Sequence, residues 1–222
     1  MDKFLKKIVW LVMAAPVIYL AFVWNQLPDK VAMHFDLHGN PDRYGSKNEL
    51  IGLTAILIAM NMLIYFLLTN IYRIDPKKQA AENKTRLYRI AFAVVVFISA
   101  LLSLIIYSST QGSVKLTMGF VFSGVGLLFA IIGNYMPNLK PNYFAGFRIP
   151  WALENAENWR KTHYLGGRLW FAGGLLLAII CLFIPPVAAI IVFFTVVIII
   201  TVIPIVYSYR LYKEQKSKTT NH

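Results

Sequence analysis

The sequence predicts an all-α fold, a polytopic membrane helix bundle of about six transmembrane helices with one short amphipathic helix at the membrane surface. Two observations lead to this prediction. Hydrophobic residues make up 58% of the 222 residues and charged residues only 14%, which is more apolar surface than a soluble core of this size needs. Long charge-free apolar stretches also alternate with polar connections. The excess apolar residues are therefore expected to face lipid.

Six stretches approach the roughly 20 apolar residues that a helix needs to cross a hydrocarbon layer of ~30 Å. They are residues 8–24, 50–71, 87–107, 116–136, 169–183 and 187–211. Only residues 184–187 separate the last two stretches, and Pro185 and Pro186 in this segment end one helix and start another. We therefore expect the fifth and sixth spans to form a tight helical hairpin.

Lysine and arginine positions predict the orientation of the bundle. Only Lys30, Arg43, Lys47 and Lys115 lie on one side of the predicted membrane, and the other 18 of the 22 Lys and Arg residues lie on the side of both termini. Basic residues near short loops are retained in the cytoplasm, so both termini are expected there. This bias is sufficient to explain the net charge of +12. We therefore expect membrane lipids as partners and no direct binding of nucleic acid.

The composition of the spans disfavours several classes of protein. Their central stretches contain no ionisable residue, whereas ion-coupled transporters and channels usually need buried charges along the pathway. The lone Cys181 excludes a disulfide or a thiolate metal cluster within one chain. The basic residues and apolar run at the amino terminus resemble a secretory signal, but no small-residue cleavage pattern follows. We expect the first helix to stay attached and the protein to hold no cofactor.

The fourth span has one smooth face. Small residues repeat along it at spacings of four and three: Gly119, Ser123, Gly126, Ala130 and Gly133. Such residues let helix backbones approach closely in a membrane. We expect this face to pack against another helix of the same chain rather than to form a dimer contact.

The outer loop, residues 25–49, is dense in turn-forming residues. Residues 31–38 can run extended, and residues 39–42 then form a turn. On a strand His34, Asp36 and His38 would share one face, which raises the alternative of a zinc-like site. Neighbouring ligands on a strand point in parallel directions and no fourth ligand is apparent, so ordinary hydrogen-bonded histidines and no metal are the favoured interpretation.

The inner loop, residues 137–168, also contains more than a linker requires. Pro150 suits the first position of a helix, and residues 151–163 can form three turns that Gly166 and Gly167 close. Trp151, Asn155 and Trp159 would then share one side. These features predict the short helix at the membrane interface, with its tryptophans at the depth of the head groups.

The two loops carry motifs that resemble a known family. The run Gly-Asn-Tyr-Met-Pro at 133–137, the run Asn-Tyr-Phe-Ala-Gly-Phe-Arg-Ile-Pro-Trp-Ala-Leu-Glu-Asn at 142–155 and Trp-Arg-Lys-Thr-His at 159–163 resemble the signature of the SdpI immunity-protein family. The outer loop is similar to a domain of unknown function often fused ahead of that signature. The resemblance implies a single membrane domain, 1–222. In it an N-terminal helix pair, 8–71, precedes an SdpI-like region, 116–211.

The resemblance implies a multi-pass protein of the bacterial cytoplasmic membrane that protects its cell against a secreted antibacterial peptide toxin. It also implies a signalling role through a cytoplasmic regulatory partner, and no catalytic residue. The inner motif carries over to binding residues Asn134, Gly146, Arg148, Pro150, Trp151, Leu153, Glu154, Trp159, Thr162 and His163. The outer motif carries over to His34, Gly39, Pro41, Asp42 and Lys47.

Two alternatives belong to other classes. A membrane-embedded metal-dependent enzyme would use His34, Asp36 and His38 outside, or His163 with Glu154 or Glu157 inside. It is disfavoured because no serine or cysteine nucleophile arrangement is apparent. A transporter of small apolar solutes or peptides is disfavoured by the uncharged spans. We therefore expect a non-enzymatic protein.

Overall fold

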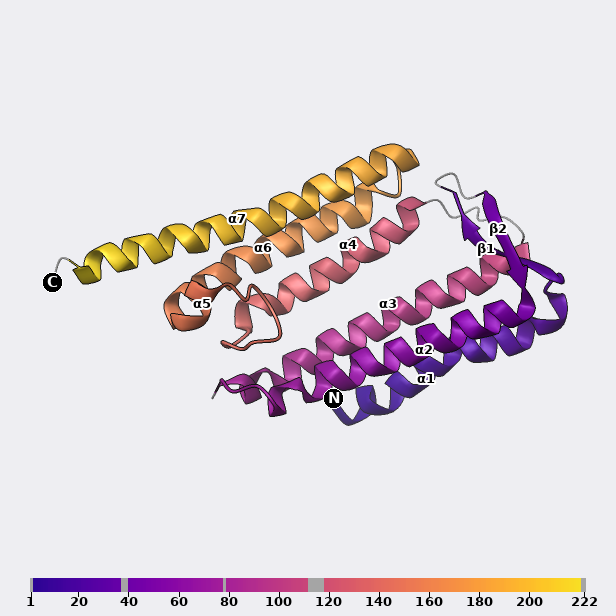
Figure 1. The fold of residues 1–222 in the computed structure, drawn as a ribbon, viewed down its shortest axis with the longest axis horizontal. Coiled ribbons are helices and arrows are strands. Elements are labelled where there is room, and N and C mark those ends of the chain that lie inside the picture. Colours follow the sequence, from indigo (N-terminus) through magenta and orange to yellow (C-terminus); the bar gives the residue numbers. More distant parts are fainter. Residues whose placement is uncertain (1, 37–39, 78, 112–117, 221–222) are drawn as a thin grey trace.

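The computed structural model describes residues 2–36, 40–77, 79–111 and 118–220 (Figure 1). Within these ranges six helices are long and apolar enough to cross a membrane. They are α1 (Asp2–Val23), α2 (Lys47–Asn70), α3 (Lys84–Gln111), α4 (Met118–Tyr135), α6 (Ala156–Ile180) and α7 (Pro186–Thr220). The prediction of an all-α membrane bundle with six spans is confirmed. The predicted break before the last span is also present, because α6 ends at Ile180 and α7 begins at Pro186.

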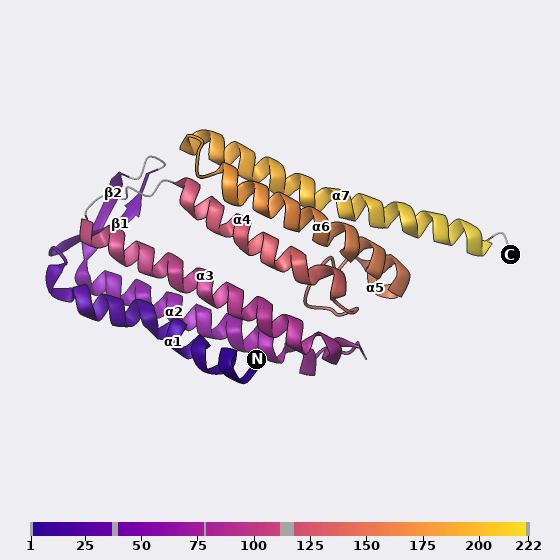
Figure 2. The same ribbon diagram turned by 180° about the vertical axis from the view of Figure 1, so that it is seen from behind.

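The helices form two groups of three (Figures 1 and 2). Helices α1, α2 and α3 lie side by side, α4, α6 and α7 form the second group, and α3 and α4 run along the boundary between them. A small β-hairpin lies at one end of the bundle, which we call the hairpin end. The opposite end holds the start of α1 and the end of α7, and we call it the terminus end.

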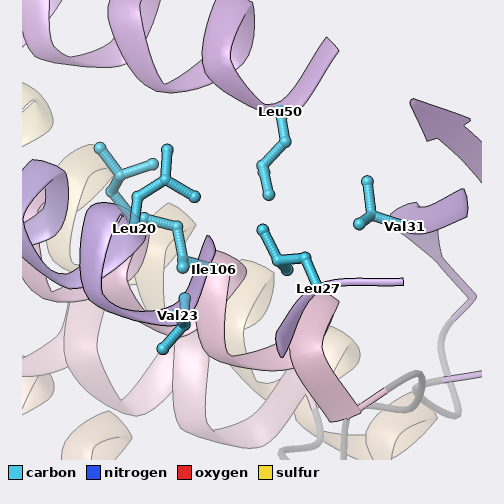
Figure 3. Packing of buried hydrophobic residues seen from close by; sticks show 7 residues of the cluster. Leu20, Val23, Leu27, Val31, Leu50 and Ile106 are labelled. Atoms are coloured by element: carbon cyan, nitrogen blue, oxygen red, sulfur yellow. The ribbon is translucent and has the colours of Figure 1, made fainter. Parts of the chain in front are cut away.

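The hairpin is built into the core of the first group. Strand β1 (Lys30–Phe35) pairs antiparallel with β2 (Pro41–Ser46). Figure 3 shows Val31 of β1 and Leu27 before it close to Leu50 of α2 and Ile106 of α3, in one buried cluster. Burying these apolar side chains stabilises the loop by ~1.5–3 kcal/mol each. Strand β1 and the residues just before it are therefore packed into the bundle.

The strand pairing differs from the sequence prediction in its details. Residues 30–35 are extended as expected, but Pro41 and Asp42 belong to the second strand rather than to a turn. The pairing register shifts between Ala32 and Phe35, so strict alternation of the side chains is interrupted. Strand β2 leads directly into α2, where the Ser46 hydroxyl accepts the N–H of Glu49 at 3.3 Å and caps the helix.

The predicted smooth face of α4 packs within the chain. A Cβ on Gly133 would lie 2.5 Å from the backbone nitrogen of Phe171, and one on Gly126 would lie 2.7 Å from that of Ala178. The Ser123 hydroxyl also donates to the carbonyl of Ala178. Helices α4 and α6 thus meet backbone to backbone, which membranes permit where side chains are small. The expectation of an intrachain contact is confirmed.

The predicted helix begins at Pro150 as expected, but its predicted extent to residue 163 is wrong. A short helix α5 (Pro150–Glu154) ends at Asn155, which is extended, and its side-chain oxygen accepts the N–H groups of Glu157 and Asn158 to start α6. Helix α6 then runs to Ile180, through Gly166 and Gly167. The fifth span therefore starts at Ala156 and not near residue 169. Trp151 and Trp159 belong to different helices and do not share a face.

Short 3₁₀ turns complete the connections. At the hairpin end η1 spans Trp24–Gln26. At the terminus end they are η2 (Ile71–Arg73) and η3 (Ala80–Asn83) between α2 and α3, and η4 (Met136–Asn138) after α4. These turns bring the α2–α3 connection beside the inner loop.

Candidate functional site

Asn142 shapes the inner loop between η4 and α5. It is 3% exposed, and its side-chain oxygen accepts the N–H groups of Phe144 at 2.9 Å and Ala145 at 2.7 Å. Its amide donates to the carbonyls of Lys140 at 2.9 Å and Ala145 at 3.2 Å. The buried side-chain amide of Asn142 thus supplies the hydrogen-bond partners that backbone groups would otherwise find in a helix or sheet.

The loop meets α6 at Gly146 and His163. The N–H of Phe147 donates to Nε2 of His163 at 3.0 Å, and Nδ1 of the same ring lies 2.8 Å from the carbonyl of Trp159. Nε2 therefore accepts and Nδ1 donates, which fixes the neutral tautomer of a fully buried ring. Gly146 has a φ of 96°, and a Cβ there would overlap Nε2 of His163. Only glycine fits this position.

Trp159 supports the same junction. Its side chain is 1% exposed, its indole N–H donates to the carbonyl of Leu139 at 2.7 Å, and its ring stacks on His163 with centroids 3.8 Å apart. The indole thus ties the start of α6 to the residue that follows η4. Trp159 and His163 are parts of the internal framework rather than of a surface.

A buried polar network joins α5, α6 and α7. The Asn158 amide donates to the carbonyl of Ser208 at 3.0 Å, and its oxygen accepts the hydroxyls of Ser208 at 2.5 Å and Thr162 at 3.0 Å. The Trp151 indole N–H donates to the Ser208 hydroxyl at 3.1 Å. Thr162 and Trp151 belong to the motif recognised in the sequence, whereas Asn158 and Ser208 were not predicted as site residues. The i,i+4 spacing of Asn158 and Thr162 was an available signal, whereas Ser208 lies far along the chain.

The inner loop is also bound to the α2–α3 connection, a contact that no pattern in the sequence predicts. Asn83 is fully buried, and it exchanges two hydrogen bonds with the backbone of Lys140, at 2.8 and 3.0 Å. The carboxylate of Asp75 accepts the N–H of Tyr143 at 2.8 Å. The ammonium of Lys77 donates to the carbonyl of Leu153 at 2.9 Å. These contacts hold the two helix groups together at the terminus end.

The remaining residues of the predicted inner motif lie at the surface. Asn134, Gly146, Arg148, Pro150 and Glu154 are exposed, and Leu153 is half-buried. The guanidinium of Arg148 donates to the carbonyl of Tyr143 at 3.3 Å, which holds the side chain against the loop. The predicted site therefore divides into a buried framework, Trp159, Thr162 and His163, and an exposed rim that includes Arg148 and Glu154.

The outer motif is a surface feature of the hairpin. Nδ1 of His34 lies 2.6 Å from Oδ1 of Asp42, and these side chains are 68% and 48% exposed. The Lys47 ammonium lies 5.7 Å from the ring centroid of Trp24, and Pro41 is paired with Phe35. Gly39, like His38 and Lys115, falls outside the described residues.

A small apolar groove lies between the hairpin and the helices. Its volume is about 240 Å³, and its walls include Met33 and Phe35 of β1, Leu101 and Ile105 of α3 and Val121 of α4. His34 and Asp36 also line it. This arrangement places an apolar recess beside charged and hydrogen-bonding groups at the hairpin end.

The alternative catalytic sets are not assembled in the described part of the chain. No group of three or more His, Cys, Asp and Glu side chains there lies close enough to hold a metal ion. Both ring nitrogens of His163 are occupied by backbone groups, and Glu157 pairs with Lys161 at 2.8 Å. The buried histidine is therefore not positioned to act with either glutamate.

Comparison with known proteins shows that each of the two loops lies in a region that matches a protein-family model. Residues 138–208 match the SdpI/YfhL protein family, and residues 11–58 match a domain of unknown function, DUF1648. The immunity protein SdpI of Bacillus subtilis (strain 168) is 27% identical over 130 residues, which cover 58% of this chain and 60% of that relative. No solved structure matches the chain. The chain is thus a membrane protein in which a region that matches the SdpI/YfhL family follows a region that matches DUF1648, and the resemblance seen in its sequence is confirmed.

Proposed function

We propose that this protein is a bacterial membrane immunity protein that protects its own cell against a secreted antibacterial peptide toxin. The observation that carries the proposal is the match of residues 138–208 to the SdpI/YfhL family, together with a relative that is named an immunity protein. A non-enzymatic role fits the chemistry of the inner site, because its histidine is used as a structural hydrogen-bonding group. Protection would then act through binding.

The proposed orientation puts the hairpin end outside the cell and both termini in the cytoplasm. The bias of Lys and Arg toward the terminus end supports it. Thiol labelling of Tyr44→Cys and Glu154→Cys in intact cells tests it, since both native side chains are exposed and the native Cys181 is buried. An impermeant reagent should label position 44 alone. Equal labelling of both positions would contradict the orientation.

The outer hairpin is the proposed site of toxin recognition. It is fixed to α2 and α3 by its buried side, while His34, Asp42 and Arg43 face outward. The neighbouring groove of about 240 Å³ has room for an apolar side chain of a peptide. A toxin that enters the membrane surface would meet this recess before reaching the spans.

The exposed rim of the inner motif is the proposed contact for a cytoplasmic regulatory partner. Arg148 lies on the surface of a loop that buried hydrogen bonds hold in place, and a guanidinium group binds carboxylates or phosphates through two parallel hydrogen bonds. An acidic partner surface would match it. This role would be additional to protection.

Expression in a toxin-sensitive host, followed by challenge with candidate peptides, tests the proposed function directly. The proposal expects survival with the native chain and not with the empty vector, at a verified membrane abundance. Arg148→Ala should reduce survival or partner binding, whereas Arg210→Ala, an exposed cation on α7, should not. If no peptide distinguishes the native chain from the vector, the proposal fails.

A further inference from the structure

A second and larger groove runs along the boundary between the two helix groups. Its volume is about 750 Å³, and its apolar walls come from Phe92, Val96 and Phe97 of α3 and from Leu127, Leu128 and Ile131 of α4. Val96 is 39% and Leu127 is 52% exposed, so the groove opens toward the surroundings of the bundle. For helices of a membrane protein these surroundings are lipid chains.

The groove has one charged end. Arg89 and Tyr135 line it at the terminus end, and the guanidinium carbon of Arg89 lies 5.9 Å from the centroid of the tyrosine ring. Nε of Arg89 is buried, and within the described residues it has no hydrogen-bond partner. A buried donor without a partner is unfavourable. An anionic oxygen at this end of the groove would satisfy it.

The length of the groove corresponds to one leaflet. From Arg89 to Ala100, which both line it, α3 rises about 16 Å at ~1.5 Å per residue. Half of a hydrocarbon core of ~30 Å is about 15 Å. The groove therefore extends from the head-group level at the terminus end to about the middle of the membrane, which is the depth of a single acyl chain.

We propose that this groove binds one anionic phospholipid, with an acyl chain along the apolar walls and the phosphate at Arg89. Charge complementarity favours this occupant, because Arg89, the cation among the described residues that line the groove, lies at the end where basic residues gather. The cytoplasmic leaflet, which that end would face, is the one that carries anionic lipids. The proposal is independent of protection against a toxin.

Native mass spectrometry of the full chain tests the proposal. The protein is purified in mild detergent and mixed with equal amounts of phosphatidylglycerol and phosphatidylethanolamine. One phosphatidylglycerol should be retained with a preference of about tenfold, because phosphatidylethanolamine has the same phosphate but adds an ammonium group whose positive charge opposes binding beside Arg89. Arg89→Gln should remove this preference. Arg86→Gln is the matched control, since that guanidinium donates to the carbonyl of Glu82 outside the groove, and it should behave like the native chain.

A second variant tests the apolar part of the site. Ala93→Phe places a ring in the groove between Arg89 and Phe97 and should reduce retention of both lipids several-fold, while glycerol phosphate should not compete. An unchanged lipid preference in Arg89→Gln would overturn the proposal. The proposal would also be overturned if the native protein had the mass of a dimer and Ala93→Phe had the mass of a monomer. The groove would then be occupied by a second copy of the chain. If Ala93→Phe does not fold, Ala100→Phe at the inner end replaces it.

Discussion

The outer hairpin carries His34 and the junction between the inner loop and α6 contains His163, and these two histidines have opposite surroundings. His34 is 68% exposed and pairs with a carboxylate that is 48% exposed. His163 is fully buried, and both of its nitrogens are bonded to backbone groups. The first is a surface group on a rigid support, whereas the second is part of the support itself. A functional motif in the sequence can therefore contain residues that mainly define the fold.

The same comparison holds for the energetics of the two regions. Exposed ion pairs such as His34 with Asp42 contribute ~0–1 kcal/mol. A buried polar group that loses its partner costs about 1–3 kcal/mol. Substitutions of the buried residues in and around the inner loop should therefore affect folding, whereas substitutions of exposed residues in the outer motif should affect recognition with little effect on stability.

The largest expected effect is that of Gly146→Ala. A Cβ at this position overlaps His163 and requires a left-handed backbone at φ 96°, so we expect destabilisation by more than ~2 kcal/mol. Thermal unfolding and membrane abundance measure it. Gly52→Ala is the control, because a Cβ there meets nothing within 4 Å. Native-like unfolding of Gly146→Ala would mean that the junction with α6 is not tightly packed.

Asn158→Leu should have the next largest effect. The change leaves the Ser208 hydroxyl and carbonyl and the Thr162 hydroxyl without their buried partner, at a loss of ~2–4 kcal/mol. Asn48→Leu, at an exposed position of α2, should change stability by less than ~0.5 kcal/mol. Equal unfolding midpoints for the two variants would refute the importance of the buried network.

Asn83→Ala tests the link between the helix groups. It removes two hydrogen bonds to the backbone of Lys140, and we expect a loss of ~1–3 kcal/mol together with faster proteolysis of the inner loop. Glu82→Ala breaks only an exposed ion pair with the same lysine, 3.7 Å long, and should be nearly neutral. Similar proteolysis of both variants would show that Asn83 does not hold the loop.

The smallest effect on stability is expected for Asp42→Asn. It weakens an exposed pair with His34, so the unfolding free energy should fall by less than ~1 kcal/mol. Survival under toxin challenge should fall more clearly if the hairpin is the recognition site. A stability loss as large as that of Asn83→Ala would contradict the division between a recognising outer surface and a structural framework of buried residues around the inner loop.

Local patterns in the sequence were sufficient to predict much of the fold. Apolar length identified all six spans, and the spacing of Gly126 and Gly133 identified the close face of α4. The same local reasoning misread Gly166 and Gly167 as a helix end. Their lack of a side chain instead allows α6 to pass close to Phe147 and Pro137. Glycine signals both a break and a close approach, and only the neighbours distinguish them.

The amino-acid order alone established that this chain crosses a membrane as helices, because lipid requires long apolar stretches whose backbone groups are bonded internally. It also established the family resemblance of the two loops. Only the assembled structure decided which motif residues are framework and which are surface. Asn83 with Lys140 and Asn158 with Ser208 are partners distant along the chain, and no local pattern encodes a contact that exists only after the helices pack.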